Sequence, residues 1–305
     1  MRLAAIDVGT NSTRLLVADV QDGRITAEHA REMVITRLGK GVDRSRRFDQ
    51  DALRRTLEVL AGYAATCREL GVERSRMVAT SATRDASNRQ RFLDGARELV
   101  GVEAEVLTGR QEAAAAFLGA THDLPGDQRT LVVDIGGGST ELIIGRPRSQ
   151  EPEAMVSLDV GCVRLHERHL HDDPPSAAQV AALRADAAAQ LARVAGVLDP
   201  ASAELVVGVA GTITTVTAIA LGLDAYDPRR IHRATVSAAE VAATAEKLAA
   251  MTVAERAALP VMASGREDVI AAGALLLDEL VSSFGFPGLV ASETDILDGV
   301  LLGMA

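Results

Sequence analysis

The sequence predicts an α/β fold made of two similar halves, and two observations carry this prediction. First, strand-like apolar runs alternate with helical patterns along the whole chain, which is typical of layered α/β domains. Second, the phrase LAAIDVGTNS at residues 3–12 returns as LVVDIGGGST at residues 131–140. With 305 residues, 48% of them hydrophobic, the chain is long for one domain and suits two.

The two phrases share an apolar run, an aspartate, a polar turn with glycine, and a second apolar run. Their alignment pairs Asp7 with Asp134, Gly9 with Gly136, and Ser12 with Ser139. The apolar runs that follow the turns lie at 13–20 and 140–145. Each copy therefore predicts a buried strand, a tight turn and a returning strand, and two such turns can hold one ligand from two sides.

After its hairpin, the first half predicts strands that alternate with helices. Residues 50–70 form an amphipathic pattern, because Leu53, Leu57 and Leu60 fall on one stripe of a helix. The other elements expected in this half are a strand at 77–83, a helix at 88–101, a strand at 104–109 and a helix at 110–124.

The second half continues the alternation after its hairpin at 131–145. Further elements are expected at 154–160 (strand), 176–198 (helix), 204–209 (strand), from about 212 (helix), 237–251 and 266–284 (helices), 288–291 (strand) and 296–304 (helix). We expect domains at 1–124 and 125–305, with the final helix, about 296–305, packing back on the first domain. The alternative is a single doubly wound sheet in which two similar turns arise by chance.

Composition restricts the partners and the compartment. The net charge of −10 argues against nonspecific nucleic-acid binding, so no nucleic-acid partner is expected. The two cysteines and the absence of a signal-peptide pattern suit the cytoplasm. The uncharged stretch 205–223 is nearly long enough to span a bilayer, but Gly208 and Gly211 interrupt it, so we expect a strand, a turn and a helix and no membrane partner.

The motif DIGGGSTE at 134–141 is typical of a phosphate-binding turn. Consecutive glycines let the backbone point its N–H groups at an anion. The residues concerned are Gly136, Gly137, Gly138 and Ser139. Asp134 and Glu141 suit Mg²⁺, which accepts a few carboxylates and keeps its waters. The motif matches neither a Walker loop nor the dinucleotide fingerprint, and the alternative is a plain tight hairpin.

The first turn, DVGTNS, repeats this chemistry more weakly. Asp7 is a candidate metal ligand, and the candidate phosphate-binding residues are Asn11, Ser12 and Thr13. A plain turn favoured by glycine and asparagine is the alternative. The stretch GVAGTITT adds Gly211 and Thr212, where a helix begins after a strand and suits a phosphate. Close helix–strand packing would explain these glycines equally well.

Three further residues are candidates for the chemistry itself. Ser81 and Arg84 follow a strand in TSATRDASN, where the guanidinium can clamp a phosphoryl group, although a surface arginine is the alternative. Glu112 lies one turn into a helix in LTGRQEAAAAF. It is either a capping charge or a general base that deprotonates a water attacking phosphorus.

Seven motifs together resemble one family. DVGTNS, SATRDASN, LTGRQEA, DIGGGSTEL, GVAGTIT, the arginine of SGREDVI (264–270) and DILDGVLLG (295–303) follow the order seen in the exopolyphosphatase/guanosine pentaphosphate phosphatase (Ppx/GppA) family. The resemblance covers essentially the whole chain. It implies two ribonuclease-H-like domains of the actin, Hsp70 and sugar-kinase superfamily around an interdomain cleft, with one phosphate-binding hairpin in each.

The resemblance also implies roles for individual residues. Glu112 matches the catalytic glutamate, Asp134 and Glu141 match acidic positions near the metal, and Arg84 matches a residue lining the phosphate cleft. The phosphate loop and cleft positions match at Gly136, Gly137, Gly138, Ser139, Asn11 and Ser12. The chain departs from the family pattern at Thr108, Gln111 and Asp298.

By this resemblance the protein is expected to be an exopolyphosphatase. It would use Mg²⁺, with Mn²⁺ as the alternative ion, to release orthophosphate from the end of inorganic polyphosphate. Many relatives carry extra C-terminal helical domains, so this sequence resembles the short two-domain type and is expected to prefer shorter chains. The alternatives are hydrolysis of guanosine pentaphosphate, an ATP-dependent kinase, and a sensor that binds polyphosphate or an alarmone without turnover. The resemblance also allows a homodimer.

Overall fold

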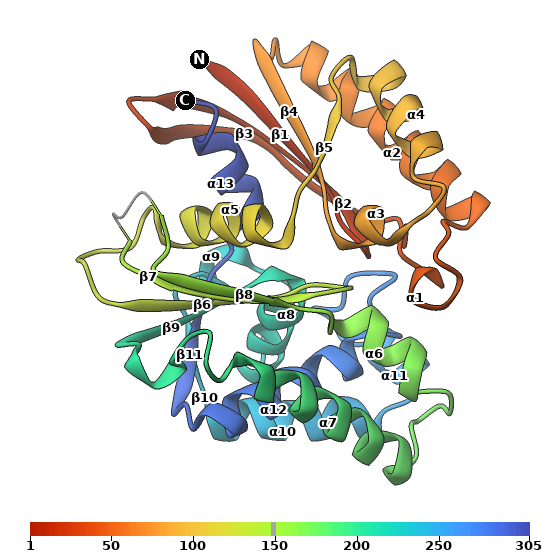
Figure 1. Ribbon diagram of the computed structural model, residues 1–305, viewed down its shortest axis with the longest axis vertical. Coiled ribbons are helices and arrows are strands. Elements are labelled where there is room, and N and C mark those ends of the chain that lie inside the picture. The colour runs from red at the N-terminus through yellow and green to blue at the C-terminus, as the bar shows by residue number, and fades with distance from the viewer. Residues whose placement is uncertain (148–150) are drawn as a thin grey trace. The chain divides into compact units, whose positions relative to one another are not determined.

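The computed structural model describes residues 1–147 and 151–305 of the chain (Figure 1). The chain forms two compact units, each built around its own sheet. The first unit contains Met1–Gly119 and Asp295–Ala305, and the second contains Ala120–Thr294. The chain thus passes into the second unit a few residues before position 124, and its last helix belongs to the first unit.

The first unit has a five-stranded sheet in the order β3-β2-β1-β4-β5. Its strands are β1 (Arg2–Val8), β2 (Ser12–Gln21), β3 (Arg24–Ile35), β4 (Arg74–Ala79) and β5 (Ala104–Val106). Its helices are α1 (Val42–Ser45), α2 (Gln50–Glu69), α3 (Ser81–Asp85), α4 (Gln90–Val100), α5 (Gly109–Thr121) and α13 (Ile296–Leu302). The first three strands are antiparallel, and β4 and β5 continue the sheet parallel to β1.

Strand β1 is buried on both faces because helices cover both sides of this sheet. Ala4, Ile6 and Val8 belong to a core that also contains residues of α2 and α4. Leu3 and Ala5 point the other way and pack with residues of α5 and α13. Figure 1 shows α2 and α4 on one face of the sheet and α13 on the other. This double burial explains why the start of the chain is a continuous apolar run.

The second unit has a six-stranded sheet in the order β10-β11-β9-β6-β7-β8. Its strands are β6 (Thr130–Ile135), β7 (Thr140–Gly145), β8 (Ala154–Leu158), β9 (Leu205–Val209), β10 (Thr235–Ser237) and β11 (Gly288–Ala291). Its helices are α6 (Cys162–His169), α7 (Ala177–Leu191), α8 (Ala210–Ala220), α9 (Pro228–Ile231), α10 (Ala238–Ala250), α11 (Val253–Ala257) and α12 (Ile270–Phe284), with 3₁₀ turns at Ala192–Val194 and Pro200–Ser202.

The two sheets share one topology. Read from β8, the second sheet runs β8-β7-β6-β9-β11, with antiparallel pairs among the first three strands and parallel pairs after them. This is the order of the first sheet, with β10 added at one edge. The prediction of two similar α/β halves is therefore confirmed, and each half has the ribonuclease-H-like order.

The uncharged stretch at 205–223 forms strand β9 followed by helix α8. Across the described ranges 1–147 and 151–305, no helix combines the length and the apolar character needed to cross a membrane.

Some elements differ from the predicted ones. The strand expected at 77–83 ends at Ala79, and the short helix α3 follows it. The helix expected at 176–198 ends at Leu191 and continues as a 3₁₀ turn. Strand β3 was not predicted, because it lies at the edge of the sheet and most of its residues are exposed. An exposed strand lacks the alternation of apolar and polar residues that identifies a half-buried one.

Candidate functional site

The two repeated phrases form hairpins with the same turn geometry. In the first turn (residues 9–12) the N–H of Gly9 donates to the carbonyl of Ser12 at 2.9 Å. In the second turn (residues 136–139) the N–H of Gly136 donates to the carbonyl of Ser139 at 3.0 Å. The repeat in the sequence is therefore also a repeat in the backbone.

Helix α6 holds the carbonyl groups of the second turn. The N–H of Cys162 donates to Gly136 O at 3.0 Å, and the N–H of Val163 donates to Gly137 O at 2.9 Å. The Nε of Arg164 donates to Gly138 O at 2.8 Å. Because the carbonyls face the helix, and no hydrogen bond in the described part of the chain uses the N–H groups of Gly137 and Gly138, these N–H groups are available to an anion.

The carbonyl groups of the first turn are held in the same way. Thr10 O accepts from the N–H of Gly39 at 2.8 Å, and Asn11 O accepts from the N–H of Arg37 at 2.9 Å. The hydroxyls of Thr10 and Ser81 share a hydrogen bond of 2.8 Å, which joins this turn to α3. Asn11 Oδ1 is buried and has no hydrogen-bond partner within residues 1–147 and 151–305.

Two predicted phosphate-binding residues of the first hairpin differ in their surroundings. Ser12 is partly exposed at the start of β2. Thr13 is fully buried, and its hydroxyl shares a hydrogen bond of 2.9 Å with that of Thr36. Tyr63 donates to the carbonyl of Thr13 at 2.9 Å. The hydroxyl of Thr13 therefore belongs to the core under α2, and we leave it out of the proposed phosphate contacts.

Glu112 and Arg84 form a buried ion pair. Glu112 lies in the first turn of α5, is 8% exposed, and accepts from Arg84 Nη1 at 2.5 Å. The same nitrogen donates to Leu107 O at 2.8 Å. Burial raises the pKa of the Glu112 carboxyl above its ordinary value, while Arg84 lowers it and the charge of Asp7 raises it further. A carboxylate with a raised pKa that is held ionised by one arginine suits a general base.

Asp7 offers one carboxylate oxygen to a cation. Its Oδ2 accepts from Arg14 Nη2 at 2.7 Å, and Arg14 also pairs with Asp295 at the start of α13. Its Oδ1 is buried and has no hydrogen-bond partner among the described residues. Burial raises the pKa of Asp7, which indicates an incompletely compensated charge. A hard divalent cation such as Mg²⁺ fits this oxygen.

Asp134 and Glu141 are the corresponding acids of the second unit. Both are buried, and they lie directly opposite each other on β6 and β7. Ser157 donates to Glu141 Oε1 at 2.7 Å. Like charges directly across a strand pair repel each other, so a nearby cation would stabilise them. Over the described ranges no group of three or more acidic, histidine or cysteine side chains lies close enough together to hold a metal ion.

Gly211 and Thr212 begin helix α8, close to the second turn. Ala210 has a φ of 68°, a left-handed conformation that is uncommon outside glycine. Arg266, 7% exposed, donates to Gly211 O at 3.1 Å and to Thr215 Oγ1 at 2.8 Å. A Cβ placed on Gly273 would lie 2.7 Å from Thr212 Cγ2 and 3.0 Å from Cys162 Cβ. The start of α8 therefore lies beside the start of α6, which holds the second turn.

The structure assigns contacts at the candidate site to residues that the sequence did not single out. These residues are Thr10 and Arg14, which contact the predicted residues Ser81 and Asp7. Arg266, the arginine of the SGREDVI motif named in the family resemblance, contacts Gly211. No local pattern pairs Arg14 with Asp295, since 281 positions separate them.

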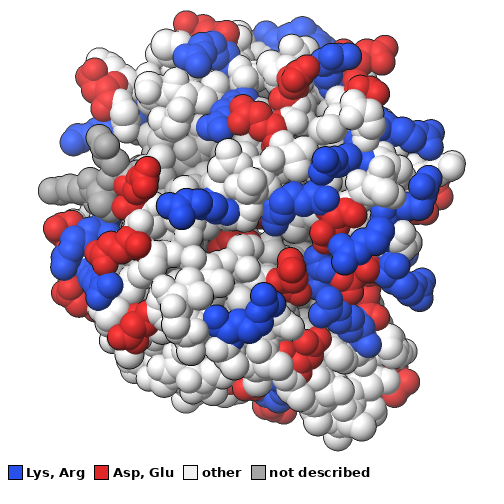
Figure 2. All heavy atoms as spheres, in the orientation of Figure 1, with Lys and Arg blue, Asp and Glu red and all other residues white. Residues whose placement is uncertain are grey.

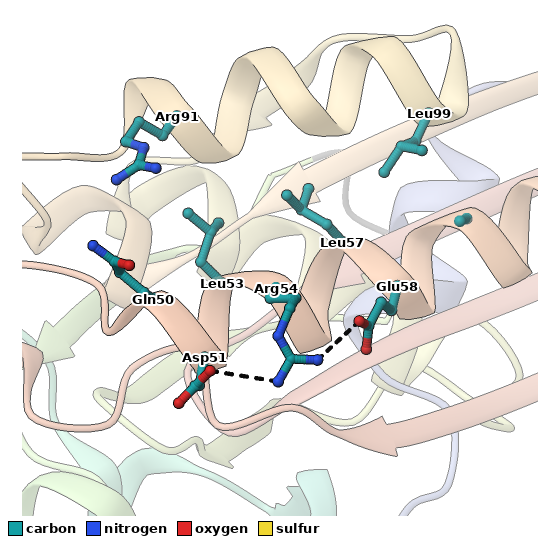
Figure 3. Close-up of a pocket in the computed structure, with 9 residues that line it drawn as sticks. Gln50, Asp51, Leu53, Arg54, Leu57, Glu58, Arg91 and Leu99 are labelled. Carbon is teal, nitrogen blue, oxygen red and sulfur yellow. Dashed lines mark hydrogen bonds and ion pairs between the residues drawn. The ribbon is translucent and has the colours of Figure 1, made fainter.

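A surface pocket of about 540 Å³ between α2 and α4 is separate from these groups (Figure 3). Its lining consists of Gln50, Asp51, Leu53, Arg54, Leu57, Glu58, Ala61, Arg91 and Leu99. None of these is a predicted site residue. Arg54 pairs with Asp51 at 3.4 Å and with Glu58 at 2.9 Å, so charges at the pocket neutralise one another.

Comparison with known proteins identifies the family. The family model described as the Ppx/GppA phosphatase family matches residues 16–305. The chain belongs to the Ppx/GppA phosphatase family. It is 42% identical over 318 residues to Exopolyphosphatase 2 of Mycobacterium tuberculosis, covering 100% of this chain and 98% of that protein. The Ppx/GppA resemblance inferred from the motifs is thereby confirmed.

Two further comparisons describe the relatives of this Ppx/GppA protein. The crystal structure of an exopolyphosphatase from Cytophaga hutchinsonii matches it with a TM-score of 0.89 and 26% identity, over 100% of this chain and 97% of that one. A guanosine-5'-triphosphate,3'-diphosphate pyrophosphatase of Vibrio atlanticus is 39% identical over 170 residues, which is 55% of this chain and 33% of that protein. Membership of the family makes this chain a hydrolase of phosphoanhydride bonds, and Ppx/GppA phosphatases generally depend on a divalent metal.

Proposed function

We propose that this Ppx/GppA protein is an exopolyphosphatase, which removes the terminal phosphate of inorganic polyphosphate as orthophosphate. One observation carries the proposal: the buried pair of Glu112 and Arg84 lies in the unit that also presents the first turn. Support comes from the end-to-end similarity to Exopolyphosphatase 2.

In the proposed reaction Glu112 accepts a proton from the attacking water. The water oxygen forms a bond to the terminal phosphorus, and the bond from that phosphorus to the bridging oxygen breaks. Orthophosphate leaves, and the chain becomes one unit shorter. Arg84 uses Nη1 for Glu112 and Leu107, so the rest of its guanidinium can bind oxygens of the phosphoryl group. Most of the catalysis then comes from positioning and charge neutralisation.

We assign the phosphate contacts to the turns of both units. In the first unit they are Asn11, Ser12 and Ser81. In the second unit they are the turn formed by Gly136, Gly137, Gly138 and Ser139, with Gly211 and Thr212 at the start of α8. The N–H of Gly136 closes this turn, so the N–H groups of Gly137 and Gly138 are the ones assigned to phosphate oxygens. Support comes from the carbonyl groups of both turns, which hydrogen-bond to other segments.

As candidate ligands of Mg²⁺, or of Mn²⁺ as the alternative, we assign Asp7 in the first unit and, separately, Asp134 and Glu141 in the second. When bound, the ion would neutralise phosphate charge. We predict that Asp7→Asn raises the Mg²⁺ concentration needed for half-maximal rate by about tenfold or more, because it removes a hard anionic ligand. A Mg²⁺ titration of phosphate release tests this. Asp22→Asn, which changes an exposed aspartate in the turn between β2 and β3, is the control. Identical titrations for both variants would contradict the role of Asp7.

Arg84→Gln should lower the rate and also change its dependence on pH. Arg84 lowers the pKa of Glu112, so its removal raises that pKa and leaves less ionised base at a given pH. The acidic limb of kcat/KM should therefore move to higher pH, while loss of the phosphoryl contact lowers kcat by about 10²–10³-fold. Arg84→Lys should restore part of the shift. An acidic limb that stays in place, or moves to lower pH, would contradict the effect of Arg84 on the pKa of Glu112.

A second candidate is removal of the 5′-terminal phosphate of guanosine pentaphosphate, which the Vibrio relative favours. The chemistry is the same and only the substrate differs. Initial rates of orthophosphate release from medium-chain polyphosphate, guanosine pentaphosphate and ATP separate the candidates. We expect polyphosphate to react fastest. Faster release from guanosine pentaphosphate would make that compound the main substrate in place of polyphosphate. Phosphate transfer from ATP to an acceptor would indicate a kinase, and tight binding without turnover would indicate a sensor.

We also propose the cytosol as the compartment. Cys67 and Cys162 are both buried free thiols, which suits a reducing environment. The homodimer suggested by the family resemblance stays a prediction.

A further inference from the structure

A row of exposed cations lies beside the first turn, in a chain whose net charge is −10. We call it the basic strip and define it as Lys40, Arg44, Arg47 and Arg89, all of them exposed. Three of these residues come from the segment between β3 and α2, and Arg89 precedes α4. No local pattern in the sequence marks this group, because Arg89 is distant in the chain from the other three residues.

The near end of the basic strip contacts the first turn and α3. The N–H of Gly39, the residue before Lys40, donates to Thr10 O at 2.8 Å. A Cβ on Gly39 would lie 2.2 Å from Thr10 Cγ2 and 3.1 Å from Ala82 Cβ. Lys40 therefore follows directly on a residue packed against the proposed phosphate turn and the helix that carries Arg84.

Hydrogen bonds between two segments fix the far end of the basic strip. The N–H of Ser87 donates to Arg46 O at 2.8 Å. The N–H of Phe48 donates to Asn88 Oδ1 at 2.8 Å, and Asn88 Nδ2 donates to Phe48 O at 3.1 Å. Arg47 and Arg89 therefore flank the same junction of the two segments, and the strip continues from one segment to the other.

The cations of the basic strip lack acidic partners. Within the described ranges no ion pair involves Lys40, Arg44, Arg47 or Arg89, whereas nearby Arg46 pairs with Asp85 at 3.1 Å. Arg54, at the adjoining end of α2, pairs with Asp51 and Glu58 (Figure 3). Figure 2 shows Lys and Arg side chains gathered over α1 and the loop after it. Exposed cations without partners attract polyanions.

We propose that the basic strip binds the part of the polyphosphate chain that extends beyond the terminal phosphate being removed. The inference rests on the proposed function. Arginine side chains bind phosphate oxygens in a fork, and polyphosphate carries charge along its whole length without bases or apolar groups. A row of exposed cations suits that ligand. Long chains should therefore bind more tightly than chains too short to reach the strip, which opposes the expectation of a preference for shorter chains.

The test compares two double variants with the same change in net charge. Arg44→Gln/Arg47→Gln alters the basic strip. Arg24→Gln/Arg68→Gln is the control, since both of its arginines are exposed. Arg24 follows the C-terminal end of β2, about 30 Å from the first turn at the start of that strand. Arg68 lies in the last turn of α2, about 30 Å from the start of that helix, which adjoins the basic strip. KM is measured for tripolyphosphate and for long-chain polyphosphate at low and at moderate salt.

We expect the strip variant to raise the KM for long chains about tenfold relative to the KM for tripolyphosphate. The KM for long chains should also depend less on salt concentration in this variant than in the wild type. The control should leave this ratio as in the wild type. The same ratio in both double variants would overturn the proposal. So would an equal loss for tripolyphosphate and long chains, since it would place these arginines at the reacting end.

Direct binding separates this inference from the proposed function. If the wild type releases no phosphate from any polyphosphate, the proposed function fails. The Kd of long-chain polyphosphate, measured for the wild type and both double variants, then tests whether the basic strip binds the chain. A weakening of about tenfold in the strip variant alone supports it, and equal Kd values overturn it. Single-stranded DNA of equal charge that binds the strip as tightly as polyphosphate would also overturn the assignment.

Discussion

Glu112→Gln should lower the rate of orthophosphate release from polyphosphate by about 10²–10⁴-fold, the usual contribution of a general base. The amide keeps the size of the carboxylate and can still accept from Arg84, so the fold around α5 should persist. It cannot take up the proton of the attacking water. Rates under saturating polyphosphate and Mg²⁺ measure the loss directly.

The matched control is Glu103→Gln. Glu103 is exposed in the same unit, and among the described residues its one ion pair is with Arg97, at a distance of 3.5 Å. It should retain the wild-type rate, and circular dichroism should show both variants folded. If Glu112→Gln hydrolyses polyphosphate as fast as the control, another group accepts the proton and the assignment of the base is wrong.

Gly299→Ala should destabilise the first unit by about 3 kcal/mol or more, the upper range for overpacking. Helices α5 and α13 approach each other through glycines. A Cβ on Gly299 would lie 1.8 Å from the carbonyl oxygen of Ala115, and a Cβ on Gly119 would lie 1.6 Å from that of Asp295. Backbone atoms cannot yield as a flexible side chain can, so the helices would have to separate.

Urea denaturation of Gly299→Ala and of Gly62→Ala gives the comparison. Gly62 lies inside α2, and a Cβ there would meet nothing within 4 Å. Gly62→Ala should therefore leave the free energy of unfolding unchanged or raise it by up to about 1 kcal/mol. A Gly299→Ala protein as stable as this control would contradict the close helix crossing. The expected separation would also displace Glu112 on α5 and Asp295 before α13.

Local patterns identified the features that local physics determines. The apolar runs on both sides of Asp7 and Asp134 predicted the two hairpins, because a buried strand must be apolar and a tight anion-binding turn needs glycine. The position of Glu112 one turn into a helix was also readable, since a strand and a glycine precede it. The sequence contained no sign that Arg84 Nη1 bonds to Glu112 Oε2, because this depends on where the turn after β4 meets the start of α5.

Features that depend on distant contacts could not be predicted in this way. Arg14 meets Asp295 only because the last helix packs on the first sheet. Helix α6 was not expected, yet its first N–H groups orient the second turn. The close crossing of α5 and α13 at Gly119 and Gly299 could not be predicted from the sequence either. Each glycine alone looks like an ordinary helix position without a side chain.

We expect the wild-type protein to cleave polyphosphate one phosphate at a time from its end. ³¹P NMR of the reaction on medium-chain polyphosphate with Mg²⁺ measures this. We expect orthophosphate from the first time point, while the average chain length falls and the number of chain-end phosphates stays constant. An increase in chain-end phosphates, which indicates internal cleavage, or no orthophosphate from a folded protein would contradict this mechanism.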